Sequence, residues 1–577
     1  MFIVMSMLAV SFVGCTKDTG DKQGQITDGG KKEETQLEGS LITEKPTTFT
    51  IFLNFNNMPF NPEWRVWQEI AKRTNIHLEG VISQSNSNEQ EAFNLMVSSG
   101  KLADIIGYVD ASELEKLGRD GGILPLNDLI KEHAPHIQAL LDSDERFRQT
   151  AVSLDGNIYQ IPKNQNLLTA EFWWIRQDWL NKLNLKAPTT VDEVYNVLTA
   201  FRNEDPNGNG QKDEIPLFDR AGHKMPDEFL YFWDTSTEFY PRDGKMTFEP
   251  MEENFKTGVR NIVKWYKEGL IDPEIFTRGP KSRDILLSGN LGGMTHDWPS
   301  AGDYNATLPE SIPNFEMVAI APPADQHGVI KERTMRYPGV GWSISSQCKD
   351  PVTVIKFMDF FFTEEGSDLM NWGIEGETYV VNADGTKSYT DTVMKSEQTP
   401  LGYLRSLGIQ YRIGMNQNPE YEYAFMTPAA KAAAELYNSH PEWFAKDIPP
   451  YLDGKLGLKY LPEDEVEYKK IMSSIRPYVD EKFQSWMLGT ADFDAEYDAF
   501  IAELKARGIE RAIEINQKSY DIFIGKYNKN NEQVKYLLIV FVVKVFVYLH
   551  DPYSSFLLRL IEIQGQFQIL CLSILVK

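Results

Sequence analysis

Hydrophobic residues between positions 47 and 109 follow two periods in turn. Residues 47–55 (TTFTIFLNF), 76–83 (IHLEGVIS) and 103–109 (ADIIGYV) are rich in apolar and β-branched side chains, which is typical of strands. Residues 63–75 and 88–100 carry apolar side chains at helical spacing. This β-α-β-α-β order with short connections predicts a mostly parallel sheet covered by helices, and such sheets bind ligands at the carboxyl ends of their strands.

A second run of alternating patterns begins at residue 172. Residues 172–176 (FWWIR) predict a strand that leads into a helix, and residues 191–203 predict a helix with a good start signal at Thr189 and Thr190. MVAIAPP (317–323) and GVGWSISS (339–346) read as further strands, and residues 350–373 predict one long amphipathic helix. The chain shows no internal repeat, so we expect a second α/β unit that differs in sequence from the first.

Length and charge restrict the class of protein. The chain has 577 residues, 42% of them hydrophobic, which is too long for one compact core and predicts two large lobes. A net charge of −25 disfavours nucleic acid and anionic membrane surfaces as partners, and an anionic ligand would need a local basic pocket. Three cysteines, of which only Cys348 lies in the body of the chain, exclude a disulfide framework, and no Cys/His cluster indicates zinc.

The N-terminus has the pattern of an export signal followed by a tether. Residues 2–14 are uncharged and apolar, Cys15 follows at once, and residues 16–46 are polar and glycine-rich. The stretch 1–15 resembles a bacterial lipoprotein signal, which implies that Cys15 carries fatty acids such as palmitate and anchors the protein to the membrane. It departs from that pattern at Phe12, where leucine is preferred. It also lacks preceding basic residues, so we expect the natural start to lie upstream.

The C-terminus is atypical. Residues 536–549 form an apolar run of about 14 residues, shorter than the roughly 20 that a membrane-spanning helix needs, and the run contains Lys544. The globular domain is expected to close near Tyr527. We interpret residues 528–577 as an extension produced by frameshift or readthrough; a membrane-associated tail and a packed final element are the alternatives.

A loop after the helix at 191–203 has the spacing of a calcium-binding loop. Ca²⁺ takes six to eight oxygen ligands, and alternate residues of a tight loop can supply them. Position 12 of the EF-hand pattern is Pro216 in place of the usual glutamate, so two later acidic residues would have to close the shell. The alternatives are a polar Asn-Gly turn without metal and, less favoured, Mg²⁺. The expected ligands of this structural Ca²⁺ are Asp205, Asn207, Asn209, Gln211 through its carbonyl, Asp213 and Glu214.

Catalytic motifs are missing from the sequence. No HExxH, G-x-S-x-G or phosphate-binding P-loop motif occurs, and the glycine-rich stretch 289–293 lacks the lysine and hydroxyl residue of a phosphate cradle. His133 and His136 flank Pro135 in a turn-like stretch that reads as a surface loop. A glycosidase needs two carboxylates at a defined separation, which sequence does not test in so acidic a chain. No catalytic residue is therefore predicted.

Several ordered segments resemble the family 1 extracellular solute-binding proteins, in the large lipoprotein branch that includes alginate- and oligosaccharide-binding members. The resemblance covers roughly residues 47–525. The calcium loop of that family maps onto the same six residues of this chain. The matching segments are 95–106, 121–130, 155–162, 174–217, 267–276, 341–351 and 371–379.

The resemblance implies a periplasmic-binding-protein-like fold, with two α/β lobes joined by a hinge and a ligand trapped in a central cleft. Crossings between the lobes are expected near Thr169 and near Pro322–Pro323. The expected division is residues 47–168 plus about 323–370 for lobe 1, and residues 169–322 plus about 371–527 for lobe 2.

Loops at strand ends should supply the ligand contacts. Aromatic faces stack on sugar rings, and nearby acidic or amide groups hydrogen-bond to hydroxyls, but core packing or a solvated loop is the alternative for each residue. We also considered Asn56, Trp173, His296 and Trp342, and noted that Arg333 and Arg336 could pair with a carboxylated sugar or lie solvated at the surface. The predicted contacts are Trp298 and Trp372, which we favour, and Asp297, Glu375, Tyr379, Trp174 and Asn54.

Together these observations predict a monomeric, lipid-anchored receptor outside the cell that captures an oligosaccharide and delivers it to the permease subunits of an ABC importer. The chain lacks ATP-binding motifs, so the energy for transport would come from that partner. The alternatives are a receptor for a peptide or another small solute, a cell-surface glycan-degrading enzyme, and a structural lipoprotein without a ligand.

Overall fold

The computed structural model describes residues 41–55, 58–82, 88–108, 110–165, 171–220, 227–334, 338–409, 413–444, 451–452 and 455–525. The predicted signal with Cys15, most of the 16–46 tether and the 528–577 extension lie outside these ranges. Within them, no helix has both the length and the apolar character needed to cross a membrane.

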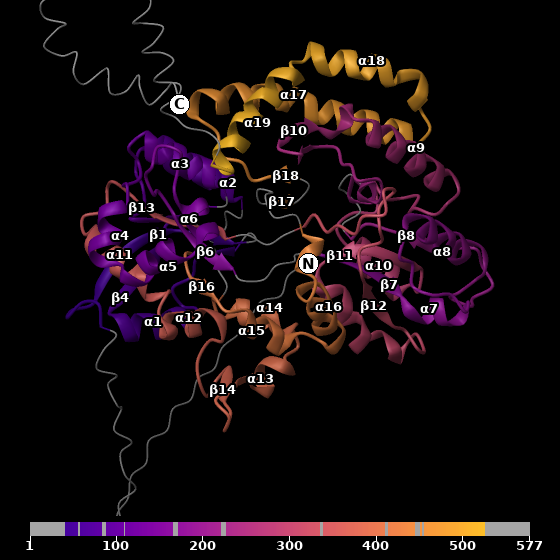
Figure 1. Ribbon diagram of the computed structural model, residues 1–577. Helices are drawn as coiled ribbons and strands as arrows, with labels where there is room; N and C mark the ends of the chain where they lie inside the picture. The colour runs from indigo at the N-terminus through magenta and orange to yellow at the C-terminus, as the bar shows by residue number, and fades with distance from the viewer. Residues whose placement is uncertain are drawn as a thin grey trace, which may run out of the picture.

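The first sheet has six strands, on the left in Figure 1. β1 pairs in parallel with β4 and with β5, which confirms the parallel arrangement predicted for the first three strands. β13 pairs antiparallel with β5 and β6, so the complete sheet is mixed. In spatial order the strands are β16 (Asn416–Gln417), β6 (Ile161–Gln165), β13 (Gly339–Ile344), β5 (Ile105–Gly107), β1 (Thr47–Phe52) and β4 (Ile76–Gly80).

Helices cover this sheet as the apolar spacing predicts. Trp67 and Ile70 of α1 are buried, and α1 ends where Asn75 adopts a left-handed conformation. α1 spans Arg65–Thr74. The other helices around this sheet include α2 (Glu89–Ser99), α3 (Ala111–Arg119), α4 (Asn127–His133), α5 (Pro135–Ser143), α6 (Glu145–Ala151), α13 (Asp391–Met394), α14 (Pro400–Ser406) and α15 (Pro419–Phe425). Two strand pairs belong to the same part of the molecule, β2 (Asn54–Phe55) with β3 (Met58–Pro59) and β14 (Tyr379–Val381) with β15 (Lys387–Tyr389).

The helix predicted over residues 350–373 is in fact two helices, α11 (Pro351–Phe360) and α12 (Glu364–Asn371). Thr363 caps α12, because its hydroxyl accepts a hydrogen bond from the Gly366 N–H at 3.1 Å. A Cβ atom at Gly366 would lie 2.0 Å from the carbonyl oxygen of Phe360. The glycine thus permits the close turn that divides the apolar run.

The second sheet has four strands, on the right in Figure 1. β7 lies between β12 and β11 and is antiparallel to both, whereas β8 is parallel to β11. In spatial order the strands are β12 (Met317–Ile320), β7 (Phe172–Arg176), β11 (Gly292–Asp297) and β8 (Ile215–Leu217).

Helices from three parts of the chain cover the second sheet, and α17–α19 cross the top of the molecule in Figure 1. The elements of this part are α7 (Gln177–Lys182), α8 (Val191–Asn203), η1 (Asp227–Trp233), β9 (Phe239–Arg242), β10 (Lys245–Phe248), η2 (Glu249–Met251), α9 (Glu253–Lys267), α10 (Ser282–Ser288), η3 (Pro299–Ala306), η4 (Leu308–Glu310), α16 (Pro428–Asn438), η5 (Pro441–Trp443), β17 (Tyr451–Leu452), β18 (Lys455–Leu456), α17 (Pro462–Met487), α18 (Phe493–Ala506) and α19 (Ile509–Phe523).

Buried side chains form separate cores around the two sheets, which we call lobe 1 (described residues of 41–165 and 338–425) and lobe 2 (described residues of 171–334 and 428–525). We expected the chain to return to lobe 1 near residues 322–323. It returns further along the sequence, because Ala324 still bridges to Thr190 and Glu332 to Phe444, both in lobe 2. The expected transfer to lobe 2 near residue 371 also differs from the structure, because the side chains from Trp372 to Tyr421 pack in the lobe 1 core. The chain instead transfers between α15 and α16.

Candidate functional site

The predicted calcium loop joins α8 to β8 and folds around Asp205. The Asp205 carboxylate accepts backbone hydrogen bonds from Gly208 at 2.9 Å, Asn209 at 3.1 Å and Gly210 at 3.1 Å. Asp205, Gly208 and Gly210 all have positive φ, which glycine adopts without steric cost. The Asn-Gly pairs of the sequence therefore let the loop turn back on its first carboxylate.

Asp213 closes the loop from the other side. Its Oδ1 accepts hydrogen bonds from Asn207 Nδ2 at 2.9 Å and Asn209 Nδ2 at 3.1 Å, and its Oδ2 accepts from Asn209 Nδ2 at 3.0 Å. The Gln211 N–H donates to Asn209 Oδ1 at 2.7 Å, and the Gln211 side chain is exposed. The structure thus gathers the oxygen-bearing side chains that the spacing predicted.

Glu214 is the strongest sign that this loop fits a cation. Its side chain is 1% exposed, and among the described residues neither carboxylate oxygen has a partner at hydrogen-bond geometry. Burial raises the pKa of Glu214, and the neighbouring Asp213 and Asp205 carboxylates raise it further. A buried carboxylate beside two others is unfavourable unless a positive charge compensates it. Oxygen donors alone, as found here, are the ligands that Ca²⁺ prefers.

The carboxyl end of β11 carries Asp297 and Trp298. The Asp297 carboxylate is fully buried, accepts hydrogen bonds from Arg283 Nη1 at 3.1 and 3.3 Å, and accepts one from the Trp298 N–H at 2.6 Å. Burial raises the pKa of Asp297 to about 6, although the positive charges of Arg283 and Arg220 oppose that rise. Trp298 is half-buried. Asp297 therefore orients the backbone that presents the Trp298 ring, and its oxygens point into the protein.

Most of the other predicted ligand contacts lie in the protein interior. Trp174 and Asn54 have no exposed surface, Trp372 is 2% exposed and Tyr379 is 6% exposed. The Trp174 indole N–H donates to the Asp297 carbonyl at 3.1 Å. The alternative of core packing therefore accounts for these side chains in this structure.

Glu375 differs, because its side chain is exposed in the loop before β14. Trp173, Trp342 and His296 are 3% exposed or less. Asn56 and Arg336 lie outside the described residues.

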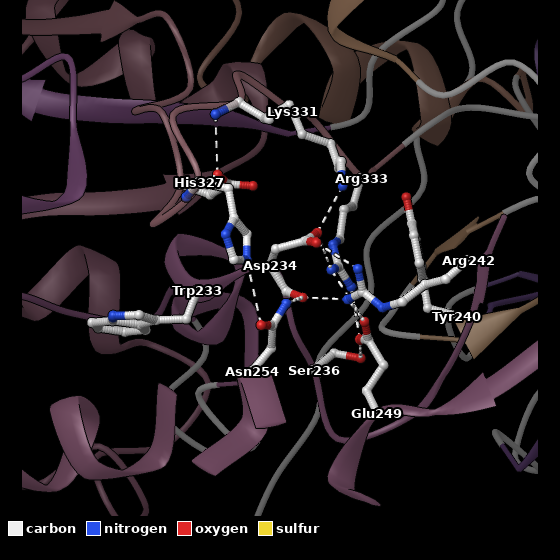
Figure 2. Close-up of polar contacts among 12 residues, drawn as sticks. Trp233, Asp234, Ser236, Tyr240, Arg242, Glu249, Asn254, His327, Lys331 and Arg333 are labelled. Carbon is white, nitrogen blue, oxygen red and sulfur yellow. Dashed lines mark hydrogen bonds and ion pairs between the residues drawn. The ribbon is translucent and has the colours of Figure 1, made fainter. Parts of the chain in front are cut away.

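Arg333 corrects another expectation, because it is neither solvated nor free to pair with a ligand. The side chain is buried, with Nη1 2.8 Å from Glu249 Oε2 and Nη2 3.0 Å from Asp234 Oδ1. Its guanidinium lies 4.1 Å from the centre of the Tyr240 ring. Figure 2 shows Arg242 and Lys331 converging on the Asp234 carboxylate, and Arg242 also pairs with Glu249. These partners are 84 and 99 residues away in sequence, so no local pattern indicates the network.

A second group that sequence reasoning missed surrounds His296. Its ring nitrogens lie 2.9 Å from Glu228 Oε2 and 3.3 Å from Glu332 Oε2, and Glu171 lies beside them. Burial lowers the pKa of His296, but the two carboxylates outweigh it and hold the pKa well above its ordinary value. The four residues come from four separate segments, which explains why they carry no motif.

A family model for bacterial extracellular solute-binding proteins matches residues 62–368, more than half of the chain. The chain belongs to this family. The matched segment includes the whole second sheet, the β4, β5, β6 and β13 strands of the first sheet, the predicted calcium loop and the end of β11.

Two carbohydrate-binding relatives match this chain to different extents. The chain is 26% identical over 517 residues, 86% of this chain and 94% of the relative, to the fructooligosaccharide ABC transporter substrate-binding protein FusA of Streptococcus pneumoniae. It is 24% identical to the polygalacturonan/rhamnogalacturonan-binding protein YtcQ of Bacillus subtilis, covering 60% of this chain and 70% of that protein.

Solved structures confirm the two-lobed, periplasmic-binding-protein-like fold class. The alginate-binding protein AlgQ2, solved without calcium ion, superimposes with a TM-score of 0.72 and 35% identity over 84% of this chain and all of that one. An EF-hand mutant of FusA in complex with fructo-nystose superimposes with a TM-score of 0.65 at 22% identity, which supports the fold.

Proposed function

We propose that this protein is the extracytoplasmic receptor of an ABC importer, which captures an oligosaccharide and delivers it to the permease subunits. The observation that carries the proposal is similarity to two carbohydrate-binding relatives, over 94% of FusA and over all of AlgQ2. Such receptors hold a ligand between two lobes that close around it. Cys15 would anchor the monomer to the outer face of the cell membrane.

Trp298 is the ligand contact that the structure supports best. It follows directly after β11, where α/β sheets place their ligands, and the residue is only half-buried. An aromatic face at that edge suits stacking against a sugar ring. Glu375, on lobe 1, is the second accessible candidate and would accept hydrogen bonds from hydroxyl groups.

Calcium has a structural role in this proposal. The oxygens of Asp205, Asn207, Asn209, Asp213 and Glu214, with the carbonyl of Gln211, would hold the ion. Bound Ca²⁺ would supply the positive charge that the buried Glu214 carboxylate needs. It would fix the connection between α8 and β8, and β8 pairs with β11, which ends at Asp297 just before Trp298.

We infer that the protein performs no catalysis, since its family consists of solute-binding proteins and the sequence carries no nucleophile or general base in a recognised motif. A receptor for a peptide or another small solute is the second candidate. A glycan-degrading enzyme would turn over polysaccharide, whereas a receptor would bind it unchanged.

Thermal unfolding of the purified protein with fructooligosaccharides, alginate oligosaccharides and polygalacturonan fragments, each with Ca²⁺ and with EGTA, tests the proposal. A ligand that binds only the folded state at 100 times its Kd adds about 2.7 kcal/mol to the free energy of unfolding. We expect one glycan class to raise the melting temperature and EGTA to lower it. No shift with any glycan would overturn the carbohydrate assignment, and no effect of EGTA would overturn the calcium assignment.

A further inference from the structure

Four side chains from distant segments meet below the carboxyl end of β11. Glu171 precedes β7, Glu228 lies in η1, His296 is in β11 and Glu332 lies a few residues before the chain returns to lobe 1. One ligating atom from each of Glu171, Glu228 and His296 lies within 4.8 Å of the other two. Donors of a single metal ion with bonds of about 2.0–2.2 Å fall within such a separation.

The fourth residue holds the imidazole ring in place. His296 Nε2 lies 3.3 Å from Glu332 Oε2, and both side chains are 1% exposed. Glu332 is fixed in turn, because its Oε1 accepts hydrogen bonds from the Thr334 N–H and hydroxyl, both at 2.7 Å. A carboxylate behind the ring is the usual partner of a metal-binding histidine, since it orients the ring and leaves the other nitrogen for the ion.

Charge in this region favours a cation. Within the described part of the chain, the ion pairs that Glu228 and Glu332 make are with His296. The nearby cations Arg283 and Arg220 face Asp297 instead. One imidazolium cannot balance both Glu228 and Glu332, whereas a divalent ion together with a neutral imidazole can.

We propose that Glu171, Glu228 and His296 Nδ1 bind a divalent transition-metal ion such as Zn²⁺ or Mn²⁺, with Glu332 as the positioning residue behind the ring. This site is separate from the calcium loop in both place and chemistry. The loop offers oxygen atoms alone, which suits Ca²⁺, whereas an imidazole with carboxylates suits transition metals.

Aromatic rings pack beside His296, and the two carboxylates are partly accessible. The ring of Trp173 lies 4.7 Å from that of His296, and the ring of Tyr231 lies 6.3 Å from it, so aromatic side chains close two sides. Glu171 and Glu228 are half-buried, and 20% of the Glu228 side chain is exposed, which leaves a route for an ion to enter.

The test is calorimetric titration of the full-length protein with ZnCl₂ and, separately, MnCl₂, after removal of metals with EDTA and in the presence of excess Ca²⁺. We expect one equivalent to bind, with affinity reduced at least tenfold in Glu228→Gln and about 10- to 100-fold in Glu332→Gln. Glu310→Gln, which removes an exposed carboxylate elsewhere in lobe 2, is the matched control and should bind as the unaltered protein does.

A second readout keeps the proposal testable if a variant folds poorly. Co²⁺ added to the unaltered protein should give visible absorption bands of nitrogen and oxygen coordination, which Zn²⁺ should abolish by competition. Absence of Zn²⁺, Mn²⁺ and Co²⁺ binding would overturn the proposal. So would binding that Asp205→Asn removes and Glu228→Gln leaves intact, because the ions would then occupy the calcium loop.

Discussion

Arg119 of α3 and Glu465 of α17 form an ion pair between the two lobes, with Nη2 3.1 Å from Oε2. α3 packs in lobe 1 through Leu114, and α17 packs in lobe 2 through Met472. The pair is mostly shielded from solvent, with 19% and 10% of the side chains exposed. The relative position of the lobes therefore depends in part on charges at the start of α17.

A neighbouring lysine strengthens the same contact. Lys459 Nζ lies 3.1 Å from Glu115 Oε1 in α3 and donates to the carbonyls of Thr150 and Val152 at 2.8 Å. Opening or sliding of the lobes has to break these bonds, so they stabilise the arrangement seen here.

Replacing Glu465 by glutamine should shift the balance between lobe arrangements. Loss of a pair of this kind costs about 1 kcal/mol, which corresponds to roughly a fivefold change in the population ratio. We expect small-angle X-ray scattering of the ligand-free variant to give a larger radius of gyration, and high salt to produce the same change in the unaltered protein. Lys116→Gln is the control, since Lys116 of α3 pairs with Asp120, the residue that follows α3 in the same lobe. Identical scattering from Glu465→Gln and the unaltered protein would show that the contact does not hold the lobes.

Glu214→Gln should have opposite effects with and without calcium. In EGTA, the substitution removes a buried carboxylate that lies beside Asp205 and Asp213, so the variant should be more stable than the unaltered protein. With Ca²⁺, it removes a charged ligand, so the variant should be less stable and bind Ca²⁺ more weakly. Melting temperatures of the variant and the unaltered protein, each in EGTA and in Ca²⁺, measure this reversal of relative stability. Glu204→Gln, which changes an exposed residue at the end of α8, is the control. Equal shifts under both conditions would mean that the loop holds no ion.

The loop could be predicted because its information is local. Ten consecutive residues from Asp205 to Glu214 contain both the oxygen donors and the glycines that let them converge. The strands and helices of the first β-α-β units are local in the same sense, and they form where the apolar periods place them.

What the sequence did not show depends on distant pairing. The sequence around Trp372 is compatible both with packing in a core and with stacking on a sugar ring. The structure shows packing, because the centre of the Tyr389 ring lies 5.0 Å from that of Trp372. The positions at which the chain passes between the lobes were predicted wrongly for the same reason. The spacing of apolar residues predicts a helix or a strand, but it does not indicate which of the two cores that element joins. The clusters around His296 and Arg333 gather residues from separate segments, so no spacing rule applies to them.

Asp234 predicts how stability responds to acid. Burial alone would raise its pKa, but the positive charges of Arg333, Lys331 and Arg242 outweigh burial and hold the pKa of Asp234 well below its usual range. The pKa of Asp234 is therefore lower in the folded than in the unfolded chain. The ion pairs of Asp234 stabilise the protein fully above about pH 4 and progressively less as pH falls below that value.

Asp234→Asn should therefore destabilise the protein at pH 7, by roughly 3–5 kcal/mol, because buried cations lose a partner. The difference from the unaltered protein should shrink at pH 3, because Asp234 then takes up a proton in the unfolded chain while it stays charged in the folded protein. Urea unfolding at the two pH values measures it, with the exposed Asp498→Asn in α18 as control. A difference that is the same at both pH values would contradict the ion-pair explanation.

Substitutions of Trp298 and Trp372 distinguish an effect on ligand binding from an effect on core packing. Both residues were predicted to contact the ligand, but Trp372 is buried and Trp298 is only half-buried. Trp372→Ala should lower the free energy of unfolding by about 3–5 kcal/mol, as expected for a large side chain removed from a core. Trp298→Ala should cost less stability and weaken the glycan that stabilises the unaltered protein at least tenfold, about 1.4 kcal/mol. Trp298→Phe should restore part of that affinity by keeping an aromatic face. A Trp372→Ala variant of normal stability that no longer bound the glycan would reverse the assignment and place the ligand against lobe 1.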